Sequence, residues 1–527
     1  MSNFSTLPRV LISRSKFVRK SQHKTSFDLG RIIPIYIDDV LPGDTRKIDL
    51  GALVRMSTPI APIMDNIYID LYAFFVPHRL TWQHWKEFMG ENSSGAGIYS
   101  GTAYKIPMAD LCAYGLSSGS IGDHMGLPIT GADASKHIYV SCLPIRGYKL
   151  IYNRFFRDQN VTAPQVVNTG DTVNYSYDSY TGGCFFASKF SDYFTRALPY
   201  AQKGAPVSIP LGTTADVYLH NPIGGSALNI DSPLLLGENM AADAKSYHIG
   251  VQEGSAPYDQ VFLKADLTHA TAATINQLRF AFQYQKLLEK DSLYGTRYWE
   301  ILKAHFGVVA PDASLQDPEL LGHRRFAINV DQVIQTTGIN QATPSQNELG
   351  ATAAVSVTGF SGNLFTKSFT EHGFLHIYAV ARHDQTYGQG VDRMWSRSLR
   401  EDFYFPVFAN LGAQKVLNKE IYADGSSNDA GVFGYQEAWA EYRYKPSKVT
   451  GLLNPSVSGS LGYWTLANNF SQLPTLSKSF IDQDRSNLAR ALSTGATGPD
   501  FIADFAFRDI AVRPMPMYSI PGLIDHH

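Results

Sequence analysis

The chain has 527 residues, with 45 basic and 47 acidic side chains, a formal net charge of −2 and 44% hydrophobic residues. This apolar share excludes wholesale disorder, because it is enough to build a sizeable core. Charged residues make up 17%, against about 25% in ordinary soluble domains, whereas aromatic residues reach 12%. We therefore expect large polar and aromatic surfaces that other molecules cover.

The chain has three cysteines, Cys112, Cys142 and Cys184. Their odd number and the lack of a C-x-x-C pair argue against a disulfide framework and a thiolate zinc site, so we expect reduced, mostly buried thiols. No apolar run approaches the ~18 residues of a membrane span. Basic residues interrupt every short apolar stretch near the N-terminus, unlike in a signal peptide. These features predict a protein made in a reducing, cytoplasm-like compartment.

Basic residues are concentrated in residues 1–24, which contain no acidic side chain. The six are Arg9, Arg14, Lys16, Arg19, Lys20 and Lys24. The rest of the chain holds 39 basic and 47 acidic residues, a net charge of −8. Because five serines and no sustained hydrophobic period accompany the basic residues, we expect residues 1–30 to form a flexible basic arm. An ordinary solvated terminus is the alternative.

The chain becomes strand-like after the arm. Residues 31–37 are rich in Ile and Tyr, but Pro34 restricts this segment to an edge or bulged strand. A turn follows at residues 39–44, with Pro42 and Gly43 at its centre. Residues 67–76 are apolar on both alternating faces, which predicts a strand inside a two-layer core.

Further strands are predicted far downstream, at residues 374–380, 435–444 and 501–507. Strands at both ends of the chain, separated by some 300 residues, imply long-range antiparallel pairing with large insertions. A sandwich or a jelly roll is built in this way, whereas a parallel βαβ fold is not.

The middle of the chain contains helical and loop-like segments. A capping box at Thr274–Gln277 opens a predicted helix over 275–290, whose apolar residues lie on two faces and favour burial between layers or subunits. A second helix is predicted over 298–306, ending at Gly307. Residues 211–272, with seven acidic and two basic side chains, and residues 335–366, with one charge, are typical of exposed loops.

The sequence contains no convincing catalytic or metal-binding constellation. The GLSSG segment at 115–119 matches a nucleophile pattern, but more Gly and Ser follow it instead of a helix. The histidines lack the spacing of metal ligands, and there is no H-E-x-x-H motif. We therefore expect no enzyme activity, no cofactor and no metal ion.

Mixtures of arginine and aromatic residues occur near 150 and near 400. Such mixtures are typical of buried interface cores, although they could also stack bases and hold phosphates. The interface interpretation fits the net charge of −8 better. The candidate intersubunit residues are Tyr152, Arg154, Phe155, Phe156, Arg157, Trp395, Arg397, Phe403, Tyr404 and Phe405.

Several motifs resemble a known family. They are VLPGD (40–44), FFVPHRL (74–80), YNRFFRDQN (152–160), ALPYAQKG (197–204), INQL (275–278), GYQEAWAEY (434–442) and IPGL (520–523). In this order they resemble the major capsid protein of microviruses, particularly of the gokushovirus branch. The similarity covers roughly residues 22–210 and 273–527 and rests on long, chemically unusual motifs.

The resemblance implies a mainly β protein, an eight-stranded antiparallel jelly roll with large loop and helical insertions. It also implies a T=1 icosahedral shell of 60 copies around a circular single-stranded DNA genome. Such a virion would be assembled in the cytoplasm of a bacterial host. The implied parts are the arm (1–30), the first part of the shell domain (31–210), a variable surface insertion (211–272) and residues 273–527. The last part would hold the helical insertion, the remaining strands and an extended C-terminal arm.

The resemblance also implies partners. Copies of the same chain would meet at two-, three- and five-fold contacts, and the insertion would form a protrusion at the three-fold axes that reaches a host surface receptor. The six basic residues of the arm are the candidate DNA-binding residues. Sixty copies would supply about 360 such charges, far fewer than several thousand phosphates. We therefore expect cations or a separate small basic viral protein to condense most of the DNA.

A second class of function stays open at this stage. A jelly-roll carbohydrate-binding protein or glycan hydrolase would use exposed tryptophans such as Trp82, Trp85 or Trp464. A hydrolase would also need two carboxylates about 5–10 Å apart, and no such pair stands out in the sequence.

Overall fold

The structure is a computed structural model that describes residues 13–91, 104–205, 207, 275–294, 297–334 and 352–518, and the backbone of 216–220 and 262–266. The chain divides into two compact units: Met1–Ala201 with Asp291–His527, and Gln202–Lys290. The larger unit is mainly β and is built around two four-stranded antiparallel sheets.

The first sheet joins strands from both ends of the chain. Its order is β1 (Ser15–Phe27), β18 (Phe501–Arg513), β3 (Thr45–Met56) and β12 (Thr358–Ser368). The pairing of β1 with β18 is antiparallel and runs from Ser15 opposite Arg513 to Phe27 opposite Phe501. The predicted strand at 501–507 is confirmed and extends to Arg513, whereas β1, β3 and β12 were not foreseen.

The second sheet has the order β2 (Ile32–Val40), β13 (Gly373–His383), β4 (Ile67–Pro77) and β9 (Glu319–Ala327). The strands predicted at 31–37, 67–76 and 374–380 are therefore confirmed. As Pro34 requires, β2 lies at an edge, and its register with β13 shifts beside this proline. The turn before β3 is also confirmed, with Gly43 at a φ of 87°.

One hydrophobic core joins the two sheets into a sandwich. Side chains of both sheets belong to a single buried cluster, among them Leu50 and Phe505 of the first sheet and Leu71 and Ile377 of the second. The ring centroids of Tyr36 and Phe507, from opposite sheets, are 4.8 Å apart. Burial of each large apolar side chain stabilises the fold by about 1.5–3 kcal/mol, so this cluster dominates the folding energy.

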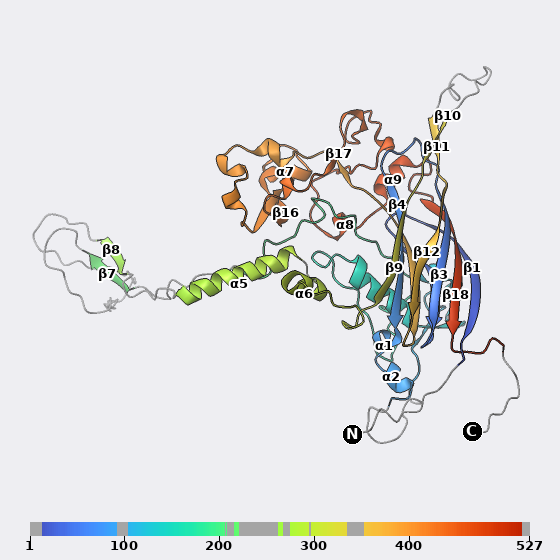
Figure 1. Ribbon diagram of the computed structural model, residues 1–527. Helices are drawn as coiled ribbons and strands as arrows, with labels where there is room; N and C mark the ends of the chain where they lie inside the picture. Colours follow the sequence, from blue (N-terminus) through green and yellow to red (C-terminus); the bar gives the residue numbers. More distant parts are fainter. Residues whose placement is uncertain are drawn as a thin grey trace, which may run out of the picture. The chain divides into compact units, whose positions relative to one another are not determined.

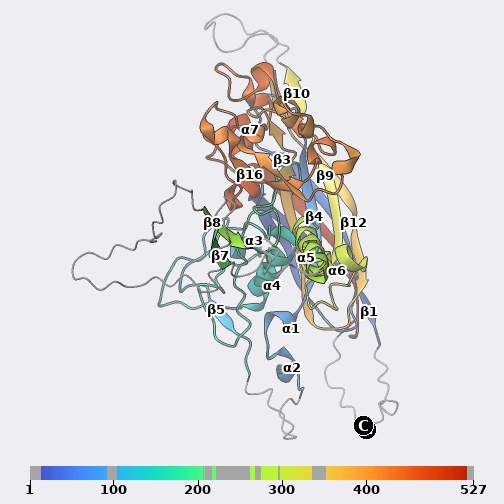
Figure 2. The ribbon, with the colours of Figure 1, turned by 90° about the vertical axis from the view of Figure 1, so that its left-hand side faces the viewer.

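The two sheets differ in what covers their outer faces. In Figures 1 and 2, helices α1 (His78–Thr81) and α4 (Leu143–Ile151) lie on the side of the second sheet. Helix α4 packs closely there, since a Cβ added at Gly147 would lie 2.9 Å from Nε2 of His376 in β13. Accordingly β4 and β13 are buried on both faces, whereas β1, β3 and β18 alternate between buried and exposed residues.

Insertions between the core strands carry the remaining elements of the larger unit. A second buried cluster, which includes Tyr193, Val416 and Phe433, stabilises the region around β15 and β16. The elements are α2 (Trp85–Phe88), β5 (Met108–Asp110), α3 (Ile121–His124), β6 (Tyr139–Ser141), β10 (Asp331–Ile334), β11 (Thr352–Val355), β14 (Thr386–Tyr387), β15 (Ala413–Leu417), α7 (Asn418–Ile421), β16 (Val432–Glu437), β17 (Ser447–Lys448), α8 (Lys478–Ile481) and α9 (Ser486–Ala491).

Both predicted helices are confirmed. Helix α5 covers Ile275–Leu293, and α6 covers Tyr298–Phe306 and ends at Gly307, whose φ of 71° is the left-handed C-cap expected there. Among the described residues the burial expected for α5 is not found, because Phe280 and Phe282 are exposed. The capping residue Thr274 lies outside the described residues.

The smaller unit contains a two-stranded antiparallel sheet of β7 (Asp216–His220) and β8 (Phe262–Asp266). The acidic segment 211–272 falls within this unit, and apart from these two strands it lies outside the described residues.

Two expectations about the later part of the chain are wrong. Residues 335–366 were expected to form an exposed loop, but 352–355 and 358–366 belong to strands β11 and β12, while 335–351 lie outside the described residues. The strand predicted at 435–444 ends at Glu437, because Trp439 adopts a left-handed φ of 65° and a 3₁₀ turn follows over Ala440–Tyr442.

Candidate interaction surfaces

The basic arm is largely a strand. Residues 15–27, which the sequence predicts to be flexible, form β1 and pair with β18 along its whole length. The expectation failed because polar residues occupy inward positions of β1, so the hydrophobic alternation of a strand is hidden. Arg9 lies outside the described residues.

The pleat of β1 separates the predicted DNA-binding residues into two groups. Arg14, just before the strand, and Lys16, Lys20 and Lys24 within it are exposed. Arg19 has the opposite parity and turns toward the second sheet. The outward lysines remain candidates for binding a polyanion, whereas Arg19 contributes to the fold.

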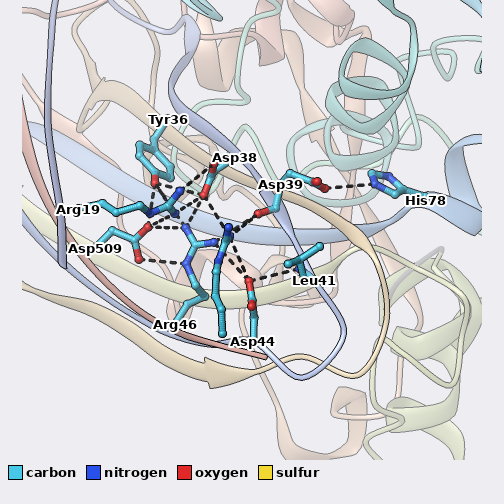
Figure 3. A network of polar contacts seen from close by, with 10 residues as sticks. Arg19, Tyr36, Asp38, Asp39, Leu41, Asp44, Arg46, His78 and Asp509 are labelled. Atoms are coloured by element: carbon cyan, nitrogen blue, oxygen red, sulfur yellow. Dashed lines mark hydrogen bonds and ion pairs between the residues drawn. The ribbon is translucent and has the colours of Figure 1, made fainter. Parts of the chain in front are cut away.

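Arg19 belongs to a network of ion pairs between the two sheets (Figure 3). Its guanidinium contacts the carboxylates of Asp38 in β2 and Asp509 in β18. Arg46 of β3 contacts the same two carboxylates, with 3.0 Å between its Nε and Oδ1 of Asp509. The hydroxyl of Tyr36 donates a hydrogen bond of 3.0 Å to Asp509. Two cations and two anions thus form a nearly neutral cluster.

Burial makes this network sensitive to the loss of any member. Arg46 is fully buried and Asp509 is 1% exposed. Burial alone would raise the pKa of Asp38, but the hydrogen bond from Arg19 and the charge of Arg46 outweigh it and lower the pKa. The ion pairs of this network link β2 of the second sheet to β1, β3 and β18 of the first.

The candidate interface residues near 150 prove to be part of the chain's own core. Tyr152 and Phe156 are buried in the main cluster. The ring of Phe155 lies 4.8 Å from that of Phe74, and the ring of Phe156 lies 5.2 Å from that of Tyr72. Tyr152 and Phe156 are therefore not available to a partner subunit, and this part of the interface expectation is wrong.

The arginines of this segment also have intramolecular partners. Arg154 forms ion pairs of 3.2 Å with Asp312 and 2.8 Å with Asp317. Arg157 donates a hydrogen bond of 2.6 Å to the carbonyl of Thr162. Both side chains therefore tie local chain segments together. The sequence shows the arginine–aromatic mixture but cannot show which side of the fold it faces.

Three of the five candidate residues near 400 are exposed, in contrast. Trp395 is 73% exposed, and Phe403 and Tyr404 are about half exposed. The guanidinium of Arg397 lies 4.4 Å from the ring centre of Tyr442 and 3.2 Å from Glu441. Phe405 is half-buried beside Arg400. This region belongs to the orange part of the ribbon in Figure 1.

Aliphatic residues missed by the sequence analysis extend this surface. Val407 is 81% exposed, and Leu399 and Leu411 are also exposed. We call the set the exposed patch: Met394, Trp395, Leu399, Phe403, Tyr404, Val407, Leu411 and Tyr442. The signal was present in the sequence as the apolar residues of 394–411, but only their exposure separates them from a core.

A cavity of about 190 Å³ adjoins the exposed patch. Met394, Arg397 and Tyr442 line it together with the buried Glu420. Burial raises the pKa of Glu420, although the backbone amide of Leu417 and the guanidinium of Arg393 oppose the shift. Aromatic walls around paired charges suit one inserted side chain of a partner.

The structural findings on metal sites and membrane spans concern the described part of the chain only. Within it, no group of three or more His, Cys, Asp or Glu side chains could hold a metal ion. Likewise, none of its helices is long and apolar enough to cross a membrane. All three cysteines are free and buried, as predicted.

The sugar-binding alternative loses one of its three candidate tryptophans. Trp82 is fully buried, and its indole nitrogen donates a hydrogen bond of 2.7 Å to Asp171. A carbohydrate-binding platform needs an exposed aromatic face, so Trp82 cannot provide one. Trp85 and Trp464 are partly buried.

Comparison with known proteins gives consistent matches over almost the whole chain. A family described as "Capsid protein (F protein)" matches residues 5–523. The chain is 40% identical to "Capsid protein VP1" of Bdellovibrio phage phiMH2K, covering 99% of this chain and 97% of the relative. It is 36% identical to proteins of the same name from Chlamydia phage 1 and Spiroplasma virus 4. Those alignments cover 99% of this chain and 98% and 97% of the two relatives.

Proposed function

The chain belongs to the capsid protein (F protein) family of microviruses, and from this we propose that 60 copies assemble into a T=1 icosahedral shell around a circular single-stranded DNA genome. Its role is structural, as a component of the virion. The observation that carries the assembly proposal is the exposed patch. The sandwich already has a complete core, yet Trp395 and Val407 remain in water.

Contacts between copies would bury the exposed patch. Apolar residues that gather on a protein surface often mark a site of contact with another protein. The patch contains Trp and Tyr, and Arg397 packs beside Tyr442; these residue types dominate interface energy when they are removed from water. The adjoining cavity offers a recess for one side chain. Many modest contacts of this kind become strong in a closed shell, because they act together.

We propose that the sandwich is an eight-stranded jelly roll. Numbered in chain order, the strands β1, β2, β3, β4, β9, β12, β13 and β18 form sheets of order 1-8-3-6 and 2-7-4-5. Every connection except that between the fourth and fifth strands crosses from one sheet to the other. This alternation supports the double Greek key of a jelly roll, a fold common in viral capsids.

The virion proposal includes further partners. The exposed basic residues near the N-terminus would contact the genome, with a separate small basic viral protein and cations supplying most of the neutralisation. Segment 211–272 would form the surface protrusion at the three-fold axes and contact a host receptor. Assembly would take place in the bacterial cytoplasm.

Expression of the full chain, followed by electron microscopy and light scattering, tests the proposal. We expect closed particles of uniform diameter that contain nuclease-protected single-stranded DNA when the genome is present. A chain that stays monomeric under all assembly conditions would refute the shell. Binding or cleavage of glycans by such a monomer would instead support the carbohydrate-binding alternative.

A further inference from the structure

The outer face of the first sheet is exposed and basic. Its outward side chains include six basic residues, Lys16, Lys20, Lys24, Lys47, Arg55 and Arg508, and two acidic residues, Asp49 and Asp504. The fourth strand, β12, contributes only Gly, Ser, Thr and Asn to this face. A local charge of +4 therefore lies on a chain whose net charge is −2.

The register of the strands places these residues in rows across the sheet. One row contains Lys20, Arg508, Asp49 and Asn363. The next row contains Gln22, Ala506, Gly51 and Ser361, which are small apart from the glutamine at the edge. The two rows line a surface trough of about 830 Å³. Its floor of small residues lets a ligand approach the backbone closely.

The cations of this face are available to a ligand. The ion pairs that Asp49 forms with Lys47 and Arg508 are 4.0 and 3.8 Å long. Exposed pairs of this length contribute little and are easily exchanged. Lys20 has no ion pair within the described part of the chain. The face thus differs from the buried Arg19 network directly beneath it, where every charge is neutralised.

We propose that this trough and the basic face around it bind the sugar–phosphate backbone of single-stranded DNA, so that the first sheet lines the inside of the shell. The inference rests on the proposed function, which supplies the genome as the polyanion. It adds Lys47, Arg55 and Arg508, which the sequence analysis did not consider, and it excludes Arg19.

The chemistry of the face favours a linear polyanion. Lys16, Lys20 and Lys24 recur every four residues along β1, which spaces them by about 13 Å in a strand. No aromatic residue occupies an outward position among the described strands of this sheet, so stacking of bases cannot dominate. The exposed Val18, Leu53 and Ile502 instead offer apolar area between the cations. Binding should therefore be independent of sequence and sensitive to salt.

The test compares two double variants of the full chain before assembly, with a fluorescent oligo(dT) 30-mer as probe. Lys20→Gln/Arg508→Gln removes two cations from the trough, and Lys136→Gln/Lys415→Gln removes two exposed cations elsewhere. Each lost phosphate contact should reduce the slope of log K against log salt by about 0.7. Between 50 and 200 mM salt, the wild type should therefore lose about sevenfold more affinity than the trough variant. Equal slopes for the two double variants would overturn the inference.

A variant that changes the shape of the trough but not its charge separates the two contributions to binding. A Cβ at Gly51 would lie 3.8 Å from the carbonyl oxygen of Phe360 and 3.9 Å from Cβ of Ala506, both ordinary contacts. Gly51→Val should therefore fold and fill the floor without changing the charge. We expect weaker oligonucleotide binding with an almost unchanged salt slope, and unchanged affinity would overturn the role of the trough.

Two further outcomes decide between the proposals. If poly-glutamate binds as tightly as oligo(dT), and if the trough variant loses this binding as well, the ligand of the trough is an acidic protein and the inference of DNA binding is overturned. If the wild type forms no particles, the shell proposal fails while the oligonucleotide comparison still tests the trough. If particles form and the trough variants bind DNA like the wild type, only the trough inference fails.

Discussion

Arg19 and Lys20 are neighbours in the sequence and should respond oppositely to the same substitution. Arg19 points toward the second sheet and contacts Asp38 and Asp509, whereas Lys20 points outward and lines the trough. We expect Arg19→Gln to lower the free energy of unfolding without changing the salt dependence of DNA binding. Lys20→Gln should leave the free energy of unfolding almost unchanged and reduce the salt dependence of DNA binding.

The size of the stability loss follows from the partners that remain. A hydrogen bond to a charged group contributes about 1.5–3 kcal/mol. Because Arg19 is 37% exposed and Arg46 still neutralises Asp509, we reduce the expected loss to about 1–2 kcal/mol. Arg46→Met removes the fully buried cation and should cost about 3–5 kcal/mol. Lys20→Gln should change stability by less than about 0.5 kcal/mol.

Urea unfolding of the unassembled chain, followed by tryptophan fluorescence, measures all three variants under one protocol. Oligo(dT) titrations at several salt concentrations give the slope for each. The order Arg46→Met, then Arg19→Gln, then Lys20→Gln is the expected ranking of destabilisation. A stable Arg19→Gln variant with a reduced salt slope would refute the reasoning, because it would place Arg19 at the DNA and outside the network.

Three further predictions concern other parts of the chain. The double variant Trp395→Ala/Val407→Asp should raise the protein concentration needed for assembly by at least about thirtyfold, as expected for the loss of about 2 kcal/mol. Light scattering measures this concentration, and the variant Tyr114→Ala, at an exposed tyrosine elsewhere, is the control. Unchanged assembly would exclude the exposed patch from any interface. Burial raises the pKa of Asp500 to about 6, although the Leu29 amide and Arg485 oppose it. The native chain therefore binds a proton that the unfolded chain releases, and stability should fall as the pH rises from about 4 through 6, by about 2–3 kcal/mol. Asp500→Asn should make the urea midpoint of unfolding nearly independent of pH over this range, and an unaltered pH dependence would contradict the assignment. Burial also raises the pKa of the Cys142 and Cys184 thiols to about 12, so a thiol reagent at neutral pH should label neither until urea unfolds the chain, and rapid labelling of folded protein would disprove their burial.

The predictable part of the fold is the part that local patterns encode. Helix α6 was located correctly because Gly307 ends it, and β4 because apolar residues occupy both of its faces. Strand β1 was missed because Arg19 and His23 occupy inward positions that usually hold apolar residues. The carboxylate that makes Arg19 suitable there, Asp509, lies 490 positions away in the sequence. No local window contains that information.

The candidate site shows the same limit. Composition identified the arginine–aromatic segments near 150 and near 400 as candidate interfaces between subunits, which is wrong for Tyr152 and Phe156 and stays a prediction near 400. It could not distinguish Phe156, which packs against the sheet of its own chain, from Trp395, which is exposed. The basic face was also hidden, because Lys47, Arg55 and Arg508 come from separate segments that only strand pairing brings together.

The structure also changes how the basic arm should be tested. Deletion of residues 1–24 would remove most of β1, and with it the Arg19 ion pairs, along with any DNA contacts. A loss of packaged DNA in that variant would therefore not identify a DNA-binding role. Substitutions of the outward lysines separate the two effects, because they leave the pairing with β18 intact.

The pairing of β1 with β18 has a consequence for the timing of folding. At a synthesis rate of about 5–20 residues per second, β18 is made between about half a minute and a minute and a half after β1. Until then β1 and β3 lack the strand that lies between them, and the first sheet cannot close. A chain released from the ribosome before β18 is made therefore lacks both the strand that joins β1 to β3 and the carboxylate of Asp509. A chain that is truncated before β18 therefore cannot complete the sandwich.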